Sequence, residues 1–410
     1  GQFREFKVCR TTMPMRAYSQ PERTASTSSG PARTWAAVVI ALALLLAAAS
    51  PTLATPAPGT SDSAIVGEGS PRPQRSPVNI ADAQNMDHAA FLPLVLIDAS
   101  QSSDAAFGVQ FFAINGPLVV KAAQAGAAWA RVPLPWAQIE PFNTTPENYQ
   151  WPDYLDPQLA ELSKRNIKVI LTFGSNPWWA STYSGGPVDR VNMSELVEFM
   201  QAAVAHYGAE PYNVKHWEFY NEPDNGSVVH SEEGQLGYFG KQPQAYVDLL
   251  QAVYDPIKAV DPEAQIVFGG IAYDNWTDTG GPFIQDFLDR VLEYGGADYF
   301  DVMNFHYYPK FRQVWAAYGP GIIGKATYLQ RKLEGYGVSK PLICTEAGMW
   351  SNPSDGGSDE LQSRYVPQVF ARSMAARLQT TIWHHLVDDI YVSSLKFGLL
   401  NPDLSPKPAF

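Results

Sequence analysis

The chain contains the sequence HWEFYNEP at residues 216–223. Its aromatic residues favour a β-strand, and Pro223 predicts the end of that strand because proline cannot donate a hydrogen bond to a neighbouring strand. A second apolar strand is predicted at residues 341–345, PLICT, directly before Glu346. Two predicted strands therefore end on a carboxylate, one on Glu222 and the other on Glu346.

The same kind of short strand recurs along the chain and alternates with amphipathic helical stretches. Strands are predicted at residues 107–113, 129–133, 167–173, 216–220, 265–269, 299–305, 341–345 and 380–383, and helices at 118–126, 155–165, 194–207, 243–260, 283–294 and 361–378. This alternation is typical of parallel strands joined by crossover helices, and eight such strands predict an α/β fold, the (β/α)8 TIM barrel. Because the chain stops at SPKPAF, residues 405–410, we expect the barrel to lack its last helix.

The N-terminal part of the chain has a different composition. An apolar run at residues 36–49 follows several arginines and precedes the small residues of a cleavage pattern, which predicts a signal-peptide region over residues 1–54. Residues 55–85 are rich in Pro, Ser and Gly and predict a linker, and residues 86–410 form the predicted barrel domain. We therefore expect a secreted, extracellular protein with no membrane span after cleavage; an uncleaved segment would act as a membrane anchor.

Composition restricts the class of partner. The net charge of −12 argues against nucleic acid, because phosphate backbones are bound by clustered Lys and Arg. The chain is rich in Trp, Tyr and Phe, which suits flat ligands such as sugar rings as well as a dense core. Of the two cysteines, Cys9 lies before the predicted cleavage point, so the mature chain would hold no internal disulfide.

The carboxyl ends of barrel strands meet at one mouth, where barrel enzymes place their active sites. Glu222 and Glu346 are therefore expected at the same mouth. Glycosidic cleavage needs such a pair, a protonated acid for the leaving oxygen and an ionised group on the other side of the anomeric carbon. The residues alone leave open whether the ionised group is a nucleophile or activates water, since that depends on the distance between the carboxyl groups.

Two motifs resemble those of clan A glycoside hydrolases, in particular the barrels of families 5 and 39. They are Asn-Glu-Pro at residues 221–223 and Thr-Glu-Ala-Gly at residues 345–348, and the resemblance extends over about residues 105–408. It implies an O-glycosyl hydrolase that acts with retention, by double displacement, on an oligo- or polysaccharide from plants or microbes. On this resemblance, Glu222 is the general acid/base and Glu346 the nucleophile.

The resemblance also implies substrate-binding residues at other strand ends. Arg131 is similar to an arginine near the nucleophile, and Asn221 to the asparagine that binds the sugar 2-hydroxyl. His306 and Tyr308 resemble a His-x-Tyr pattern in which the histidine contacts sugar or acid/base and the tyrosine bonds the nucleophile. Trp383 resembles the aromatic platform beneath the sugar, and we expect Trp178 to line a further subsite.

Two alternative functions are a metal hydrolase and a non-catalytic carbohydrate-binding barrel. A metal hydrolase could use His306, His384, His385 and Asp388, but the chain has no His-Glu-x-x-His or similar short-spaced ligand motif. A non-catalytic carbohydrate-binding barrel would be expected to have lost one of the two carboxylates. The sequence therefore implies neither a metal nor another cofactor, and a serine hydrolase is disfavoured because no Gly-x-Ser-x-Gly motif follows a strand.

Overall fold

A computed structural model describes residues 107–410 apart from 228, 232–233, 237 and 389–395. The predicted signal-peptide region and linker lie outside the described residues, as does the start of the predicted barrel domain. These predictions are therefore not tested by the fold.

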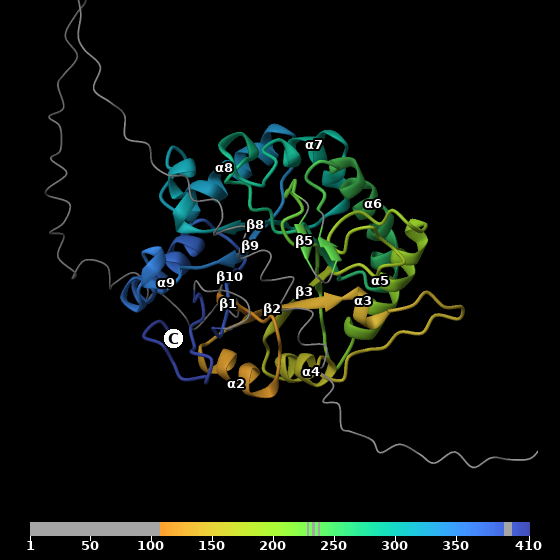
Figure 1. Cartoon of the computed structure of the whole chain (residues 1–410), viewed down its shortest axis with the longest axis horizontal. Helices are drawn as coiled ribbons and strands as arrows, with labels where there is room; N and C mark the ends of the chain where they lie inside the picture. The colour runs from red at the N-terminus through yellow and green to blue at the C-terminus, as the bar shows by residue number, and fades with distance from the viewer. Residues whose placement is uncertain (1–106, 228, 232–233, 237, 389–395) are drawn as a thin grey trace, which may run out of the picture.

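Eight parallel strands form a nearly closed barrel (Figure 1). They are β1 Phe107–Gln110, β2 Trp129–Pro135, β3 Lys168–Gly174, β4 His216–Phe219, β7 Gln265–Val267, β8 Met303–Tyr307, β9 Leu342–Ala347 and β10 Thr381–Trp383. Their order is β7-β4-β3-β2-β1-β10-β9-β8. The seam between β7 and β8 is joined by two single parallel bridges, Val267 with Val302 and Ile271 with Phe305. The predicted α/β TIM barrel is confirmed.

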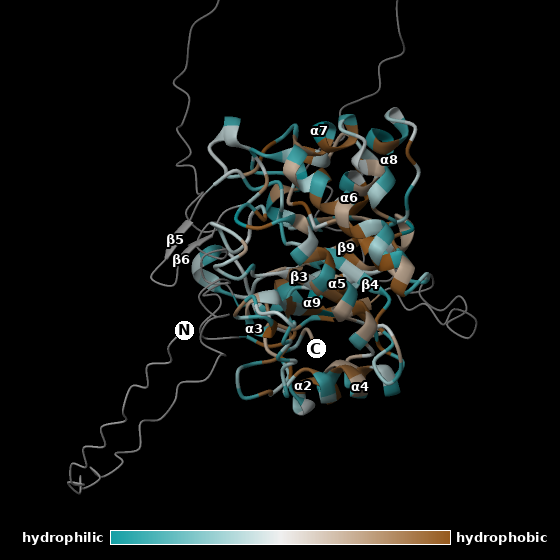
Figure 2. Ribbon diagram, turned by 90° about the vertical axis from the view of Figure 1, so that its right-hand side faces the viewer, coloured by the Kyte–Doolittle hydropathy of each residue, from teal (hydrophilic) through white to brown (hydrophobic). Residues whose placement is uncertain are grey.

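Helices surround the barrel in the order expected for crossover connections (Figure 1). The longer ones are α2 Gly116–Gln124, α4 Asp156–Lys164, α5 Met193–Tyr207, α6 Pro243–Val260, α7 Phe287–Glu293, α8 Ile322–Gly335 and α9 Asp359–Ala375. Figure 2 shows hydrophilic and hydrophobic residues alternating along these helices, as expected when one face packs on the strands. Short elements lie between them: α3 Trp136–Ile139, the hairpin of β5 Val229–Ser231 and β6 Gly234–Leu236, and the 3-10 turns η2 Thr277–Thr279, η3 Gly296–Tyr299, η4 Pro309–Trp315 and η5 Pro353–Asp355.

Several helix ends follow from local sequence. Asn115 caps α2 by accepting a hydrogen bond from the backbone of Leu118 at 3.0 Å, and Ser358 caps α9 by accepting one from Leu361 at 3.1 Å. The helix α6 begins at Pro243, as predicted, because proline is tolerated in the first turn where its missing donor would be unpaired anyway.

The core has two parts. A small cluster fills the inside of the barrel and consists of Trp129, Ile170, Val267, Val302, Ile343 and Ile382. A much larger cluster lies mainly between the strands and the helices. Because successive strand residues point to opposite faces, membership of one cluster or the other tells which way each strand side chain points.

The structure differs from the sequence prediction in several elements, and three of the differences are the largest. The helix α8 was not predicted, the strand expected at 299–305 is β8 and begins only at Met303, and the helix expected at 283–294 is α7 and begins at Phe287. After β10, residues 384–388 and 396–410 contain no helix; buried Leu399 and Leu400 pack there instead.

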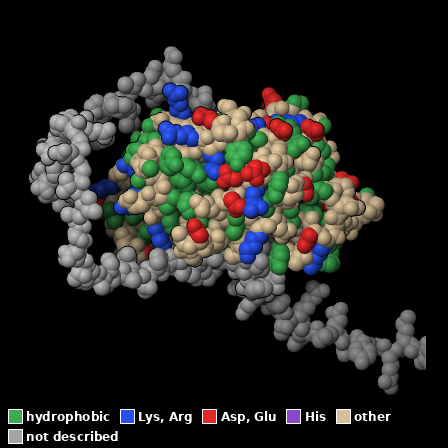
Figure 3. Space-filling model, turned by 90° about the horizontal axis from the view of Figure 1, so that it is seen from above, with side chains coloured by type: hydrophobic (Ala, Val, Ile, Leu, Met, Phe, Trp, Pro, Cys, Tyr) green, Lys and Arg blue, Asp and Glu red, His purple; other side chains and the backbone are tan. Residues whose placement is uncertain are grey.

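The surface of the described residues carries charges of both signs as well as hydrophobic side chains. On the face drawn in Figure 3, Lys and Arg side chains are interspersed with Asp, Glu and hydrophobic side chains. Among the helices described, none is both long and apolar enough to cross a membrane.

Candidate active site

Glu222 and Glu346 meet inside the barrel mouth. Glu222 follows β4, where its backbone N–H donates to the carbonyl of Gly270 at 3.0 Å, and Glu346 is the fifth residue of β9. Each is only 2% exposed. One oxygen of each carboxylate and a ring nitrogen of His306 all lie within 4.8 Å of one another. The two predicted strand-end carboxylates are therefore brought together.

The backbone around Glu222 is held in an unusual conformation. Tyr220 has φ 64° and Glu222 has φ 46°, in the left-handed region that costs a residue with a side chain about 1–3 kcal/mol. Gly270 of the next strand end makes room for the site: a Cβ there would meet Nε2 of His306 at 2.2 Å and Oγ1 of Thr345 at 2.8 Å. The strained backbone at Glu222 and the absence of a side chain at Gly270 together allow Glu222, His306 and Thr345 to lie close to one another.

Glu346 is surrounded by hydrogen-bond donors. Arg131 Nη1 donates to its Oε1 at 2.7 Å and the Tyr308 hydroxyl donates to its Oε2 at 2.8 Å, while Nδ1 of His384 lies 3.4 Å from Oε2. Burial alone would raise the pKa of Glu346, but the positive charge of Arg131 and the hydrogen bonds from Tyr308 and Arg131 outweigh it, so its pKa lies below the ordinary value. Burial lowers the pKa of His306 itself to about 3, so the permanent positive charge here is that of Arg131.

Glu222 has the opposite electrostatic environment. Burial, followed by the charges of Glu346 and Asp224, holds the pKa of Glu222 well above its usual value. Its Oε1 lies 3.0 Å from Nδ1 of His306, whose Nε2 lies 3.2 Å from Oγ1 of Thr345. Since the Thr345 hydroxyl donates to Glu218 at 3.1 Å, a neutral His306 donates from Nε2 to Thr345 and accepts at Nδ1. A protonated Glu222 completes that chain of hydrogen bonds as the donor.

Glu218 is a central residue of the site that the sequence analysis did not identify. It is fully buried and accepts two hydrogen bonds from Arg131, at 2.7 and 2.8 Å. Thr172 and Asn304 also donate to it, at 2.7 and 2.9 Å. Arg131 is therefore shared between Glu218 and Glu346. The available signal was a charged residue in the middle of an otherwise apolar strand, which is rare unless it is paired.

Most of the other predicted residues join this group. Asn221 accepts a hydrogen bond from Nη2 of Arg131 at 2.8 Å. Gln110, which was not predicted, accepts from Nη1 of Arg131 at 3.2 Å and lies 3.1 Å from Nδ1 of His384. Arg131, Asn221, His306 and Tyr308 thus all lie in contact with one or both carboxylates or with each other.

The interpretation of Trp383 as a sugar platform is corrected by the structure. Its side chain is fully buried, its Nε1 donates to the carbonyl of Phe397 at 2.9 Å, and its ring lies 6.2 Å from that of Tyr365 in α9. Ile382 points into the barrel. Because side chains along a strand alternate between its two faces, Trp383 points toward the helices and His384 points inward again, toward Glu346.

Trp178 lies in the loop after β3 and is 68% exposed. Its backbone carbonyl accepts a hydrogen bond from Arg190 at 2.6 Å. It is not among the contacts of Glu222 or Glu346, so its role in a further subsite stays a prediction.

The group of ligating atoms on Glu222, His306 and Glu346 is the one in the described chain that could hold a metal ion. However, Arg131 lies 2.7 Å from Glu346 and would repel a cation there. Of the other candidate metal ligands, Asp388 pairs with Lys407 at 2.6 Å and Nδ1 of His385 contacts the carbonyl of Val387 at 2.5 Å. The arrangement favours acid and base chemistry over metal binding.

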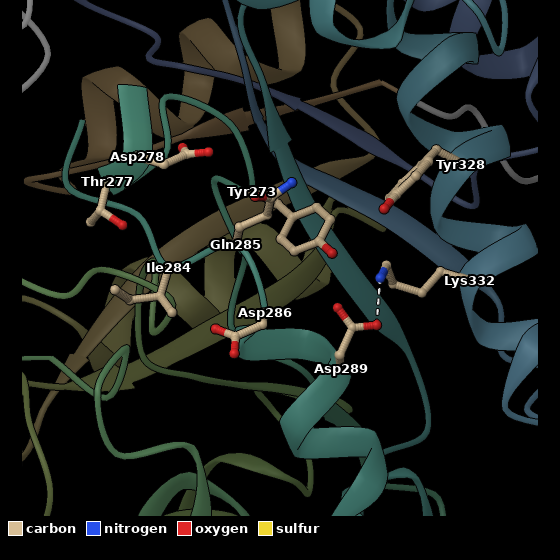
Figure 4. A pocket seen from close by; sticks show the side chains of 9 residues that line it. All are labelled: Tyr273, Thr277, Asp278, Ile284, Gln285, Asp286, Asp289, Tyr328 and Lys332. Carbon is tan, nitrogen blue, oxygen red and sulfur yellow. Dashed lines mark hydrogen bonds and ion pairs between the residues drawn. The ribbon is translucent and has the colours of Figure 1, made fainter. Parts of the chain in front are cut away.

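A separate pocket of about 500 Å³ lies between the loop after β7 and helices α7 and α8 (Figure 4). Lys332 pairs there with Asp289 at 2.5 Å and lies 5.7 Å from the centre of the Tyr273 ring. The pocket contains none of the residues that surround the two glutamates.

No protein-family model and no curated protein matches the chain. Solved structures do share its fold. A family 39 glycoside hydrolase from the gut symbiont Bacteroides cellulosilyticus WH2 superposes with a TM-score of 0.57 at 23% identity, over 74% of this chain and 61% of that one. A monomeric β-xylosidase from Caulobacter crescentus CB15 gives 0.52 at 17% identity, over 75% and 66%. GH5_18 from Streptomyces cattleya, in complex with GlcNAc, gives 0.53 at 18% identity, over 75% and 78%. The barrel is thus the fold expected from the motifs, and the chain spans less than two thirds of the length of the first two structures.

Proposed function

We propose that the chain is a secreted glycoside hydrolase, an O-glycosyl hydrolase that cleaves a plant or microbial glycan with retention of configuration. The observation that carries this proposal is the pair of buried carboxylates with opposite pKa shifts, that of Glu222 raised and that of Glu346 lowered. A pair of titratable groups driven apart in this way identifies the acid and the nucleophile or base of an active site. The N-terminal signal-peptide pattern supports secretion.

The distance between the two carboxylates supports the retaining course. Retaining glycosidases hold their carboxyl groups about 5–5.5 Å apart, whereas inverting ones leave about 6.5–9.5 Å for a water molecule. The nearest oxygens of Glu222 and Glu346 lie within 4.8 Å of each other. This is a bound on the closest approach of the two carboxyl groups, and it supports the shorter, retaining spacing.

In the first step, ionised Glu346 attacks the anomeric carbon while protonated Glu222 gives its proton to the departing oxygen. Arg131 and Tyr308 keep Glu346 ionised and oriented through their bonds at 2.7 and 2.8 Å. A covalent glycosyl ester on Glu346 and a free leaving group result.

The second step follows from the loss of charge on Glu346. Once Glu346 is an ester, it no longer raises the pKa of Glu222, so Glu222 becomes a better-stabilised anion. Glu222 then takes a proton from water, which attacks the anomeric carbon and releases Glu346. Two inversions give net retention.

Product stereochemistry tests this proposal. Purified protein is assayed against a panel of aryl β-glycosides, including xylosides and glucosides, and the released sugar is followed by proton NMR. We expect the β-anomer to appear first. An α-anomer appearing first would contradict the retaining mechanism, and no turnover of any substrate by folded protein would favour a carbohydrate-binding barrel.

A further inference from the structure

The turn that carries Glu222 is bound through its backbone on both sides. The N–H of Glu222 donates to the carbonyl of Gly270, and the carbonyl of Glu222 accepts from the N–H of Asn225, each at 3.0 Å. With φ at 46°, Glu222 has a left-handed backbone, which persists only where the surrounding structure imposes it. The position of the acid/base therefore depends on contacts made close to it in the chain.

Asp224 makes such contacts with its side chain. It is fully buried, and it is separated from Glu222 only by Pro223, whose ring restricts the backbone between them. Its Oδ1 accepts a hydrogen bond from the N–H of Ala272 at 3.2 Å, and its Oδ2 accepts one from the N–H of Tyr273 at 2.8 Å. Hydrogen bonds to a carboxylate are stronger than those between neutral groups. Asp224 thus ties the acid/base turn to residues 270–273, which we call the β7 end segment.

The β7 end segment also holds the hydrogen-bond partner of Glu222. The carbonyl of Gly270 accepts from the N–H of Glu222, and the carbonyl of Ile271 accepts from the N–H of His306 at 2.9 Å. Nδ1 of His306 in turn lies 3.0 Å from Oε1 of Glu222. Backbone groups of one short segment therefore set where Glu222 and His306 lie relative to each other.

Helix α8 fixes the β7 end segment from the other direction. Nζ of buried Lys325 donates to the carbonyl of Ala272 and pairs with Asp274 at 2.9 Å. The segment is thus held by α8 on one side and by the acid/base turn on the other. The carboxylate of Asp224 joins the segment to that turn.

Resting on the glycosidase function proposed above, we propose that Asp224 is a positioning residue that holds the Glu222 carboxyl group at the glycosidic oxygen. Because it is fully buried, Asp224 acts through Glu222 and not on the sugar. Proton transfer requires the acid within about 2.6–3.2 Å of the atom that it protonates, so a small displacement of Glu222 slows cleavage. Glu346 lies on β9 and is held by Arg131 and Tyr308, so its attack should not depend on Asp224.

The test compares two leaving groups on one sugar in the variant Asp224→Asn. Asparagine keeps the volume, but its amide N–H2 faces a backbone N–H that the carboxylate oxygen accepted. For a disaccharide, whose leaving group needs a proton, we expect kcat/KM to fall about 10- to 100-fold, against about 10²- to 10⁴-fold for loss of a general acid altogether. For the 2,4-dinitrophenyl β-glycoside of the same sugar, whose leaving group needs none, kcat/KM should stay within about 3-fold.

The two kinetic constants of the dinitrophenyl glycoside give a second measurement. Glu222 is also the base that activates water in the second step, which limits kcat when the first step is fast. In Asp224→Asn, kcat for this probe should therefore fall about 10- to 100-fold, and KM should fall with it. A smaller amount of folded protein would lower kcat and leave KM unchanged.

Asp301→Asn is the matched control. Asp301 precedes β8, and its Oδ2 accepts from the N–H of Ile266 in β7 and from Nζ of Lys258, each at 2.7 Å. The same substitution there removes a contact between a carboxylate and the backbone of β7, but at the end of the barrel away from the mouth. Asp301→Asn should lower the unfolding temperature and leave the ratio of the two kcat/KM values unchanged.

Asp224→Ser is the second variant if Asp224→Asn does not fold, because its smaller side chain brings no amide donor against the backbone N–H groups. The same difference between the two leaving groups is expected. Equal losses of kcat/KM on both glycosides, or no loss on the disaccharide, would overturn the proposal and leave the glycosidase function standing. Absence of turnover by the unaltered protein would overturn both.

Discussion

Replacing Arg131 by methionine tests the electrostatic account of the site. Arg131 is 2% exposed and holds two carboxylates, Glu218 through two hydrogen bonds and Glu346 through one. Removing one partner of a buried ion pair typically costs about 3–5 kcal/mol, because the remaining charge stays buried and unpaired. For a domain of this size each kcal/mol lowers Tm by roughly 2–4 °C, so we expect Tm to fall by roughly 6–20 °C.

The assay is thermal and urea unfolding, with Arg165→Met as the matched control. Arg165 pairs with Glu161 on the surface of α4, both about one third exposed, and such pairs contribute about 0–1 kcal/mol. Adding Glu218→Gln to Arg131→Met should restore part of the stability, since one unpaired buried charge is removed. If Arg131→Met unfolded at the same temperature as Arg165→Met, Arg131 would not be compensating the buried charges of Glu218 and Glu346. The explanation given for the low pKa of Glu346 would then be wrong.

Four other predictions concern the chemistry and one buried charge. In Glu222→Ala, an aryl glycoside with a good leaving group should still form the glycosyl–enzyme but hydrolyse it slowly, which a rapid burst of phenolate followed by slow turnover would reveal. Glu346→Ala should abolish that burst, and azide should restore turnover with inverted product; ordinary hydrolysis by this variant would refute the nucleophile assignment. The profile of kcat/KM against pH should be bell-shaped. Its acid limb should lie below the ordinary glutamate pKa, where Glu346 is protonated, and its alkaline limb above that pKa, where Glu222 ionises. If substitution of Glu222 changed the acid limb, or substitution of Glu346 the alkaline limb, the assigned roles would be contradicted. Lys325→Met should destabilise the barrel by about 3–5 kcal/mol, because fully buried Lys325 pairs with Asp274 at 2.9 Å, and Asp274→Asn should recover part of the loss on urea unfolding.

Much of the barrel could be predicted because its strands are short apolar runs with polar residues at their ends. Helix α8 could not, because its start follows the turn-forming residues Gly319, Pro320 and Gly321, which indicate a loop. The pairing of β7 with β8 could not be predicted from the sequence either, because single bridges between distant residues leave no periodic pattern in it.

The carboxylate pair could be predicted because both residues end strands, and strand ends meet at one mouth of a barrel. Trp383 was misassigned because one position along a strand reverses the face, and only the burial of Ile382 inside the barrel fixes that face. Glu218 was missed because its partners, Arg131, Thr172 and Asn304, come from three other strands or strand ends. Contacts of this kind are set by the tertiary fold and not by neighbours in sequence.

In the proposed mechanism, Glu346 forms a covalent bond with the sugar. The direct measurement is mass spectrometry of the protein after incubation with an activated 2-deoxy-2-fluoro-β-glycoside of the preferred sugar, whose intermediate hydrolyses slowly. We expect one added glycosyl group per chain, located by peptide mapping on Glu346 and absent from Glu346→Ala. A label on another residue, or no label on protein that hydrolyses the parent glycoside, would contradict it.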